Sequence, residues 1–419
     1  MLTRIDELQD ILNRLKIYAI GLFIVIVPLF HSKSLDLRTI QEIGFQYSSI
    51  AIISLFFGNI WLTLFMLLNI FLISSINMSC GQGQVMNIFI GCLLFLVSRN
   101  YFKKNDIKMI YRPIVILSVL SILFMSLQLF GIDPIFQRQD AGGMRVPGLF
   151  SDPVGIFALK SSNATFLSIS IPFLMALSSF TLYLSPLFFI PIILCQSSFS
   201  MIAGIASFLF YLFYRNRKMF LIFLAIFSIA GSIYIFKDLK NDSMTFKSRF
   251  PVWHSCVRYA LSNPIGYGPD SYRNFTKHKD FLFMSDEKYR HGIAKKFEGD
   301  SMMFKYYLPD NDIEKEKELD NLLSTIDLSK MSLWDNPHNG YLTLLFQYGI
   351  LGLLLLIGLM VEMYYRFIYS LKSHELIVIS AALLAYFVAS FAHFPLELAR
   401  TAYLFPILLG GFYALTDVE

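Results

Sequence analysis

Charged residues are scarce in this sequence of 419 residues, since Asp, Glu, Lys and Arg together make up only 16%. Ordinary soluble domains carry about 25%. Cysteine is scarce too: four residues are spaced too widely for a disulfide framework or a zinc-binding pattern. The net charge of +5 is small for this length, and it indicates Lys and Arg residues in cytoplasmic loops rather than a nucleic-acid-binding surface. These absences argue against a soluble globular domain, a disulfide-stabilised secreted module and a nucleic-acid-binding protein.

Apolar residues are abundant instead. They make up 55% of the chain, 42 of them are Phe, and the mean hydropathy is +0.57. Several runs approach or exceed the length of a membrane-spanning helix, so the sequence predicts an all-α polytopic membrane protein with about twelve transmembrane helices. The predicted spans are Ile17–Phe30, Phe45–Phe57, Ile60–Ile76, Val85–Ser98, Ile110–Phe130, Gly155–Leu177, Leu182–Leu194, Phe199–Tyr214, Phe220–Phe236, Tyr341–Met360, Leu376–Phe391 and Ala402–Leu415.

Three regions follow from this pattern. An N-terminal transmembrane region, residues 1–236, begins with an amphipathic helix at Thr3–Lys16 that we expect to lie on the membrane. Residues 237–336 have no apolar span and carry balanced charges, which predicts one large loop domain between the ninth and tenth spans. We expect a helix within it at Pro309–Lys330. Residues 337–419 form a C-terminal transmembrane region.

The orientation follows from the basic clusters in short loops. The segment Arg99–Lys108 is the clearest of these, and the positive-inside rule places it in the cytoplasm. Counting spans from there puts the cluster at 215–218, the link with Arg366 and Lys372, and both termini on the same side. The loops 131–153, 237–335 and 392–401 then lie outside. Two basic residues in the first outside loop, Lys33 and Arg38, run against this assignment.

The outside loops contain the polar side chains that are candidates for catalysis or ligand binding. Arg145 precedes the sixth span, Arg249 begins the large loop, and His338 lies just before the tenth span. Arginine holds phosphate oxygens in a bidentate geometry, and histidine accepts protons near neutral pH. Two arginines and a histidine at one membrane face therefore suggest phosphate chemistry. The alternative for each arginine is a solvated or lipid-headgroup contact.

Other residues are candidates for lining the same cavity, and they are Trp253, Asn339, Tyr341, His393 and Arg400. The polar sixth span is a candidate lining of a lipid-binding groove. The segment Gly266-Tyr267-Gly268 predicts a turn rather than a nucleotide-binding fingerprint. We expect most aromatic residues of the large loop to pack in its own core. No metal-ligand spacing is present among the loop histidines His254, His278 and His291, which we expect on the surface.

Three motifs together resemble the O-antigen ligase and O-antigen polymerase superfamily of bacterial inner membranes. The first is Arg145-x-x-Gly148-x-Phe150. The second is Arg249-x-x-x-Trp253 with Asn263-Pro264-x-Gly266-x-Gly268. The third is Pro337-His338-Asn339-x-Tyr341, followed by Gly349-Ile-Leu-Gly352. The likeness in motif covers residues 145–360, and the span pattern extends it over the whole chain.

The resemblance implies a metal-independent, inverting glycosyltransferase at the periplasmic face that uses no cofactor. Its donor is an undecaprenyl-pyrophosphate-linked glycan, and its acceptor is a lipid-linked repeat or lipid A–core. Membrane lipids and a chain-length regulator are further expected partners. His338 matches the family's essential histidine, and Arg145 and Arg249 match arginines assigned to the donor pyrophosphate. The resemblance does not decide among polymerase, ligase and protein O-oligosaccharyltransferase activity, and the motifs slightly favour a polymerase. A transporter or flippase for lipid-linked glycans is the rival class.

Overall fold

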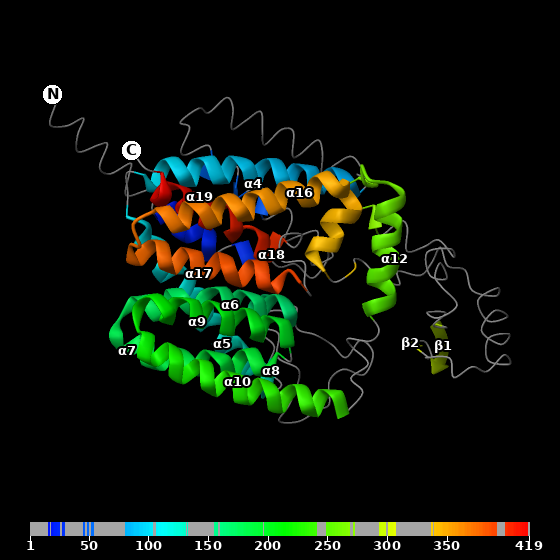
Figure 1. Cartoon of the computed structure of the whole chain (residues 1–419), viewed down its shortest axis with the longest axis horizontal. Helices are drawn as coiled ribbons and strands as arrows, with labels where there is room; N and C mark the ends of the chain where they lie inside the picture. The colour runs from blue at the N-terminus through cyan, green and yellow to red at the C-terminus, as the bar shows by residue number, and fades with distance from the viewer. Residues whose placement is uncertain are drawn as a thin grey trace. The chain divides into compact units, whose positions relative to one another are not determined.

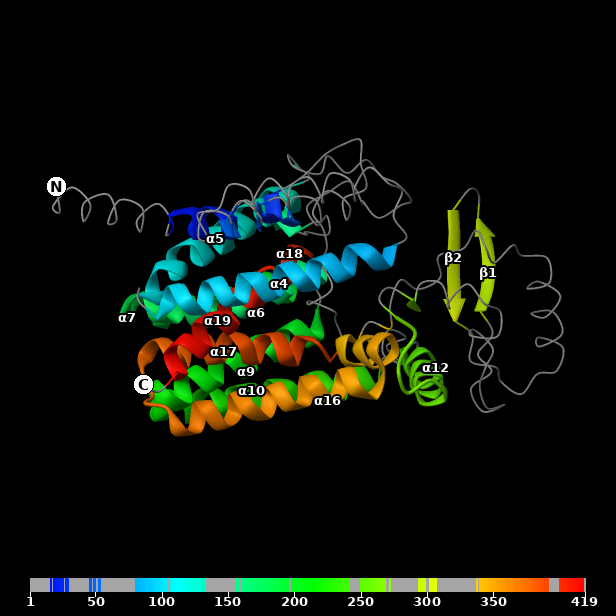
Figure 2. The ribbon, with the colours of Figure 1, turned by 90° about the horizontal axis from the view of Figure 1, so that it is seen from above.

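The computed structural model describes the part of the chain shown as coloured ribbon in Figures 1 and 2. The described residues are 16, 18–25, 27–29, 45–46, 48–49, 52–53, 80–103, 106–130, 132, 155–157, 160–195, 197–240, 249–268, 271–272, 293–298, 301–306, 337, 339–391 and 399–417. The chain packs as two units: the first combines Met1–Phe227 with Val361–Glu419, and the second is Ser228–Met360.

Helices dominate both units. The first unit contains η1 (Val27–Leu29), α4 (Cys80–Phe102), η2 (Ile107–Ile110), α5 (Tyr111–Leu129), η3 (Gly155–Phe157), α6 (Lys160–Leu177), α7 (Ser179–Leu184), η4 (Ser185–Phe188), α8 (Phe189–Leu194), α9 (Ser198–Arg215), α17 (His374–Ala389), α18 (Ala399–Ala402) and α19 (Leu404–Thr416). The second contains α12 (Arg249–Ser262), β1 (Ile293–Glu298) and β2 (Ser301–Tyr306). Two helices, α10 (Arg217–Lys240) and α16 (Gly340–Tyr369), belong partly to each.

Helix α6 forms the centre of the first unit. Every residue from Ser162 to Met175 is buried, and a helix that is buried all round belongs to the core of a bundle. Helices α5, α9 and α17 pack against it, and α17 also packs against α9 and α19. Figure 1 shows α6, α9 and α17 as neighbouring, nearly parallel rods.

Three helices are long and apolar enough to cross a membrane: Ile107–Leu129, Ser198–Arg215 and Gly340–Tyr369. Shorter apolar helical stretches occur at Asn87–Phe102, Phe180–Leu194, His374–Ala389 and Leu404–Thr416, and the second of them comprises three successive short helices. Large apolar side chains on these helices are exposed, including Leu123, Ile202 and Leu355. Lipid contact explains such exposure, so the described residues have the helices of a membrane protein.

Ser162, Asn163 and Thr165 of the sixth predicted span are buried against protein, so these three do not line a groove, whereas Lys160 and Ser161 are half-exposed. Protein is one of the two environments that a membrane span allows for polar groups, the other being a water-filled cavity. Thr165 and Ser200 are buried with their hydroxyl oxygens 3.0 Å apart, and Ser168 donates to the carbonyl oxygen of Ser200 at 2.6 Å. Asn163 accepts a hydrogen bond from Ser121 and contacts Met125 Sδ at 2.9 Å. These bonds join α6 to α5 and α9, and such interhelical bonds hold membrane helices together.

The seventh predicted span, Leu182–Leu194, is not one helix. The chain there forms α7, η4 and α8 in succession. Pro186 stands at the start of η4 and Pro191 lies within α8. Proline removes a backbone donor and its ring clashes with the preceding turn, so two prolines within six residues disfavour one continuous α-helix here.

The tenth predicted span, Tyr341–Met360, also needs correction. Helix α16 is interrupted at Gly349, where φ is 68° and ψ is −164°. Figure 1 shows its two legs pointing in different directions. The second leg runs on to Tyr369, so Arg366 is a helical residue rather than part of a link. About 20 residues follow the break, enough to cross a bilayer without the first leg.

A β-hairpin in the second unit departs from the all-α prediction. Strands β1 and β2 pair antiparallel, with Ile293 opposite Tyr306 and Glu298 opposite Ser301. The sequence between the strands is Gly299-Asp300, a dipeptide typical of tight hairpin turns. The helix predicted at Pro309–Lys330 and the amphipathic helix at Thr3–Lys16 lie outside the described residues, apart from Lys16 itself, which is helical.

Candidate functional site

The second unit joins two of the three motifs that the sequence singled out. Helix α12 begins at Arg249 and ends at Ser262, just before Asn263-Pro264. Pro251 lies in its first turn, where a missing backbone N–H is tolerated, and Pro264 disfavours helical backbone at Asn263. The partner of α12 is the first leg of α16, residues 340–348, which follows the Pro337–Asn339 stretch.

Trp253 connects α12 to that stretch directly. Its indole N–H donates a hydrogen bond to the carbonyl oxygen of Pro337 at 2.8 Å. One turn along, the Cys256 thiol lies 3.4 Å from the carbonyl oxygen of Leu342. The helix that carries Arg249 is therefore fastened to the start of α16 at two points.

An aromatic core fills the space between the two helices. Cys256, Tyr272 and Phe346 are buried together, and Tyr259 and Tyr267 pack against them. The rings of Tyr267 and Phe346 stack with centroids 4.9 Å apart. Tyr259, Tyr267 and Tyr272 of the large loop therefore pack in a core, as expected, but the core is shared with Phe346 of the tenth predicted span and is not the loop's own.

The Gly266-Tyr267-Gly268 segment pairs with the break in α16. Both glycines have positive φ, 89° and 93°. The hydrogen-bonded turn comprises residues 263–266 and is closed by a bond from Gly266 N to Asn263 O at 2.9 Å, so it shares only Gly266 with the predicted turn. Three backbone hydrogen bonds join the segments, from Tyr267 N to Phe346 O at 3.0 Å, from Gly268 N to Gln347 O at 2.9 Å and from Ile350 N to Pro264 O at 2.9 Å. The segment thus satisfies backbone groups that the break in the helix exposes.

Asn339 caps the first leg of α16. Its side-chain oxygen accepts hydrogen bonds from the backbone N–H groups of Tyr341 at 3.0 Å and Leu342 at 3.1 Å. Asparagine is among the preferred residues at this position because its side chain satisfies N–H groups that the helix leaves unpaired. Asn339 and Pro337 are both buried.

The structure brings some of the predicted site residues together. Arg249 begins α12 four residues before Trp253, a rise of about 6 Å along the helix. Trp253, Asn339 and Tyr341 all belong to the join between α12 and α16. Arg400 belongs to α18 in the first unit. His338, Arg145 and His393 lie outside the described residues.

Sequence reasoning missed two residues of the join, Cys256 and Phe346, and it named Gly349 in a motif without predicting the helix break there. Cys256 and Phe346 are fully buried, and their role depends on a contact between distant segments. The sequence features that could have indicated the join are an apolar face on α12 and the glycine at the start of the Gly349-x-x-Gly352 pattern. Within the described residues, no cluster of three or more His, Cys, Asp or Glu side chains is arranged to hold a metal ion.

No protein-family profile matches the chain, and no curated protein matches it significantly. The described residues therefore define a class by their own features. These features are those of a helical membrane protein. In its second unit, α12 and the segment with Gly266 and Gly268 pack against and hydrogen-bond to the interrupted apolar helix α16.

Proposed function

We propose that the chain is a membrane glycosyltransferase of the O-antigen polymerase and ligase type. It transfers or polymerises a glycan from an undecaprenyl-pyrophosphate donor at the periplasmic face of a bacterial inner membrane. The observation that carries the proposal is the hydrogen bond from Trp253 to Pro337. Because of it, the helix that starts at Arg249 and the stretch that contains His338 in sequence meet in one unit.

The chemistry assigns each residue a task. The acceptor hydroxyl attacks the anomeric carbon of the donor sugar, and His338 takes the hydroxyl proton as general base. A new glycosidic C–O bond forms while the anomeric C–O bond to pyrophosphate breaks. The lipid pyrophosphate leaves with the bonding electron pair, and Arg249 and Arg145 stabilise the charge that builds on it. Attack opposite the leaving group inverts the anomeric configuration.

The proposed topology has about twelve spans with both termini in the cytoplasm. Its support is the ion pairing in the first unit. Arg99 of α4 and Arg366 of α16 both pair with Asp417, which directly follows α19. Lys108 pairs with Glu375 of α17. The segments that the charge rule assigns to the cytoplasm thus share partners with one another.

Reconstitution tests the proposal. The wild type, supplied with an undecaprenyl-pyrophosphate glycan and an acceptor, should give a longer or transferred glycan. His338→Ala should lower the rate by about 10²–10⁴-fold, the range for loss of a general base. Arg249→Ala should lower it by about 10²–10³-fold, and Arg249→Lys by less because the charge remains without the bidentate fork.

His291→Ala is the matched control, because this histidine belongs to the same loop and has no assigned task. It should keep wild-type activity. Full activity in both His338→Ala and Arg249→Ala would refute the mechanism. Transfer to lipid A–core rather than to a lipid-linked repeat would identify a ligase, and transfer to a protein hydroxyl an oligosaccharyltransferase.

The break at Gly349 favours a second candidate, a transporter or flippase for lipid-linked glycans. Transporters use interrupted membrane helices around their binding sites, typically as a pair in related halves of the chain. Reconstitution separates the two functions. A transporter moves the intact lipid-linked glycan across the bilayer, whereas the proposed enzyme releases undecaprenyl pyrophosphate and changes the glycan.

A further inference from the structure

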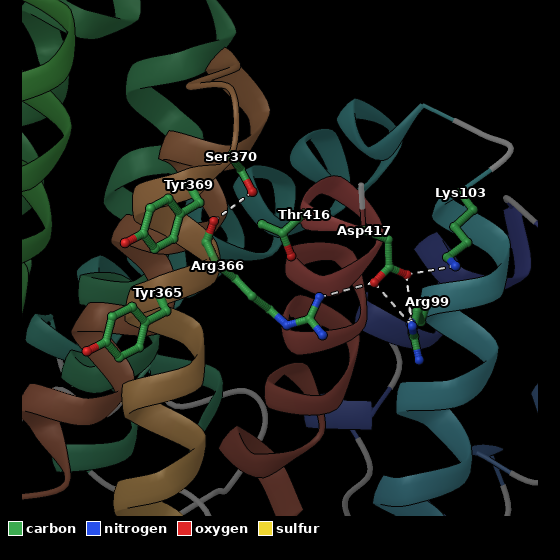
Figure 3. Close-up of a pocket in the computed structure, with 8 residues that line it drawn as sticks. All are labelled: Arg99, Lys103, Tyr365, Arg366, Tyr369, Ser370, Thr416 and Asp417. Carbon is green, nitrogen blue, oxygen red and sulfur yellow. Dashed lines mark hydrogen bonds and ion pairs between the residues drawn. The ribbon is translucent and has the colours of Figure 1, made fainter. Parts of the chain in front are cut away.

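A cleft of about 610 Å³ opens on the first unit, and none of the residues proposed for catalysis is among those that line it. Figure 3 shows the side chains that line it. They come from α4, from the last turns of α16 and from the end of α19, and they are Arg99, Lys103, Tyr365, Arg366, Tyr369, Ser370, Thr416 and Asp417.

Three cations converge on one carboxylate in this cleft. Arg99 binds Asp417 with Nε and Nη2 at 3.0 and 3.1 Å. Lys103 Nζ lies 2.7 Å from Asp417 Oδ2, and Arg366 Nη1 lies 3.2 Å from Oδ1. In Figure 3 the three side chains reach this carboxylate from two different helices. Burial raises the pKa of Asp417, but bonds from Lys103 and Arg99 lower it below the usual range, so the group is ionised at neutral pH.

The positive charge exceeds what the cleft's own carboxylate neutralises. Asp417 is the single acid among the lining residues, and Glu362, which pairs with Arg366, is the other acid in contact with these cations among the described residues. A guanidinium carries five N–H donors and an ammonium three. The bonds to Asp417 and Glu362 engage a minority of them, so the cations keep donors for an anion.

The tyrosines beside the cleft mark a membrane interface. Tyr365 and Tyr369 are exposed, and their rings stack 6.3 Å apart. Val361 and Ile368 on the same helix are exposed apolar residues. Exposed tyrosines at the end of an apolar helix are typical of the headgroup level of a bilayer. An anion entering the cleft therefore meets cations at the depth of lipid phosphates.

We propose that this cleft binds a phosphate group, and that its source is the headgroup of an anionic membrane phospholipid. Phosphate matches the guanidinium fork of arginine and the point charge of lysine. Basic pockets between membrane helices are known to take phospholipid headgroups. Asp417 holds the three cations in place, so the site is organised before the lipid arrives. The proposal does not depend on the glycosyltransferase activity.

Lipid titration of the purified full-length protein tests the site. Short-chain phosphatidylglycerol should raise the melting temperature and appear as a bound adduct in native mass spectrometry, and short-chain phosphatidylcholine should do neither. Inorganic phosphate at the same concentration should not compete. Equal binding of both lipids would overturn the proposal. Competition by inorganic phosphate at equal potency would identify a free-phosphate site and overturn the lipid source.

Charge variants locate the binding. Lys103→Gln and Arg366→Gln should each weaken phosphatidylglycerol binding about fivefold, the effect of one basic residue near an anionic lipid surface. Lys108→Gln is the matched control, since it also removes one charge and one ion pair, to Glu375. It should leave binding unchanged. Equal loss in Lys108→Gln would contradict a site at the cleft.

A second variant guards against misfolding. Ser370→Glu adds a negative charge to the cleft lining and leaves Arg99, Lys103 and Arg366 in place. It should abolish the preference for phosphatidylglycerol over phosphatidylcholine while the protein remains folded. A retained preference in a folded Ser370→Glu protein would also overturn the proposal.

Discussion

Among single residues, Gly349 carries the strictest steric requirement in the second unit. Its φ is 68°, and a Cβ there would lie 1.9 Å from the carbonyl oxygen of Pro264. Gly349→Ala should therefore destabilise the join between α12 and α16 by more than the roughly 1–3 kcal/mol that a non-glycine residue costs in this backbone conformation. The buried Cys256 thiol should become more reactive. Thermal unfolding and the rate of Cys256 alkylation, followed by peptide mapping, measure both effects.

Gly358→Ala is the control on the same helix. Apart from its chain neighbours and the backbone of its own helix, no atom of the described residues lies within 4 Å of a Cβ at this position. Alanine favours helix over glycine by about 0.5–1 kcal/mol. We expect unchanged or slightly higher stability and no change in Cys256 alkylation. Equal losses in the two variants would show that the pairing with Pro264 does not set the requirement at Gly349.

His374 predicts a pH dependence of stability. It precedes the predicted span Leu376–Phe391, and its Nε2 lies 2.9 Å from the Tyr211 hydroxyl oxygen. Burial lowers its pKa, and the charge of Arg215 lowers it further, while Glu375 opposes the shift. The unfolded chain thus takes up the proton at a higher pH than the folded protein. Stability from this group is complete above about pH 6.5 and is lost as the pH falls toward the lowered value.

Melting temperatures between pH 5 and pH 8 measure this effect. The wild type should lose stability below about pH 6.5. His374→Gln, which keeps a hydrogen-bonding group near Tyr211 but does not titrate, should show a flatter profile. Identical profiles for the two proteins would assign the acid sensitivity to other groups.

A turn near Gly266 was predictable, although it comprises residues 263–266 rather than Gly266-Tyr267-Gly268, and the break at Gly349 was not predictable. The turn is a local property, because glycine adopts positive φ without strain. The apolar sequence around Gly349 reads as a continuous helix. Its interruption arises from hydrogen bonds to Pro264, Tyr267 and Gly268, which are distant in the sequence. Periodicity and composition carry no information on such a contact.

At the scale of the helices, we expect the buried polar side chains of α6 to contribute to stability rather than to activity. Thr165→Val removes the contact with Ser200 while keeping the side-chain shape. It should lower stability by about 0.6 kcal/mol, and at most about 1.7 kcal/mol, the range for interhelical hydrogen bonds in membranes. Activity in the reconstituted assay should be retained, because Thr165 faces protein. Thermal unfolding and glycan transfer, measured on the same preparation, give the two readings.

Ser126→Ala provides the comparison. Ser126 is exposed, and its hydroxyl donates within its own helix to the carbonyl oxygen of Ile122 at 2.9 Å, with no partner on another helix in the described part of the chain. Its replacement should change neither stability nor activity. Loss of activity in Thr165→Val at unchanged stability would restore the interpretation of α6 as a substrate lining.

Hydropathy predicted helices better than it predicted their continuity. The predicted spans Ile110–Phe130, Phe199–Tyr214 and Leu376–Phe391 correspond to α5, α9 and α17 within two residues at each end. The prediction of helix continuity failed where one or two residues break the helix within a long apolar segment, because an average hydropathy does not register them. The short helix η4, with Pro186 in its first turn, divides the seventh span. The hairpin of β1 and β2 lies in a polar loop, where a turn dipeptide was the only local signal.

For the whole molecule, the candidate site was predictable only in part. The motifs at Arg249–Gly268 and Pro337–Gly352 were recognised in the sequence, and the structure joins them through Trp253 and Gly349. The position of Arg145 relative to them stays a prediction. The cluster on Asp417 was not predicted, because a carboxylate after the last helix gives no sign of the three cations it gathers.

The proposed topology makes a prediction for the whole chain, since it assigns the large loop to the periplasm and the link after α16 to the cytoplasm. Ile265 in the loop and Leu371 in the link are 85% and 91% exposed, so cysteines there should react equally with a reagent that reaches them.

A membrane-impermeant maleimide should label Ile265→Cys in cells with an intact inner membrane. Leu371→Cys should react only after that membrane is opened. Peptide mapping separates the introduced cysteine from the native ones. Labelling of both residues from the periplasm would place Arg366 and Asp417 on the periplasmic side, and the charge-based orientation would then be wrong.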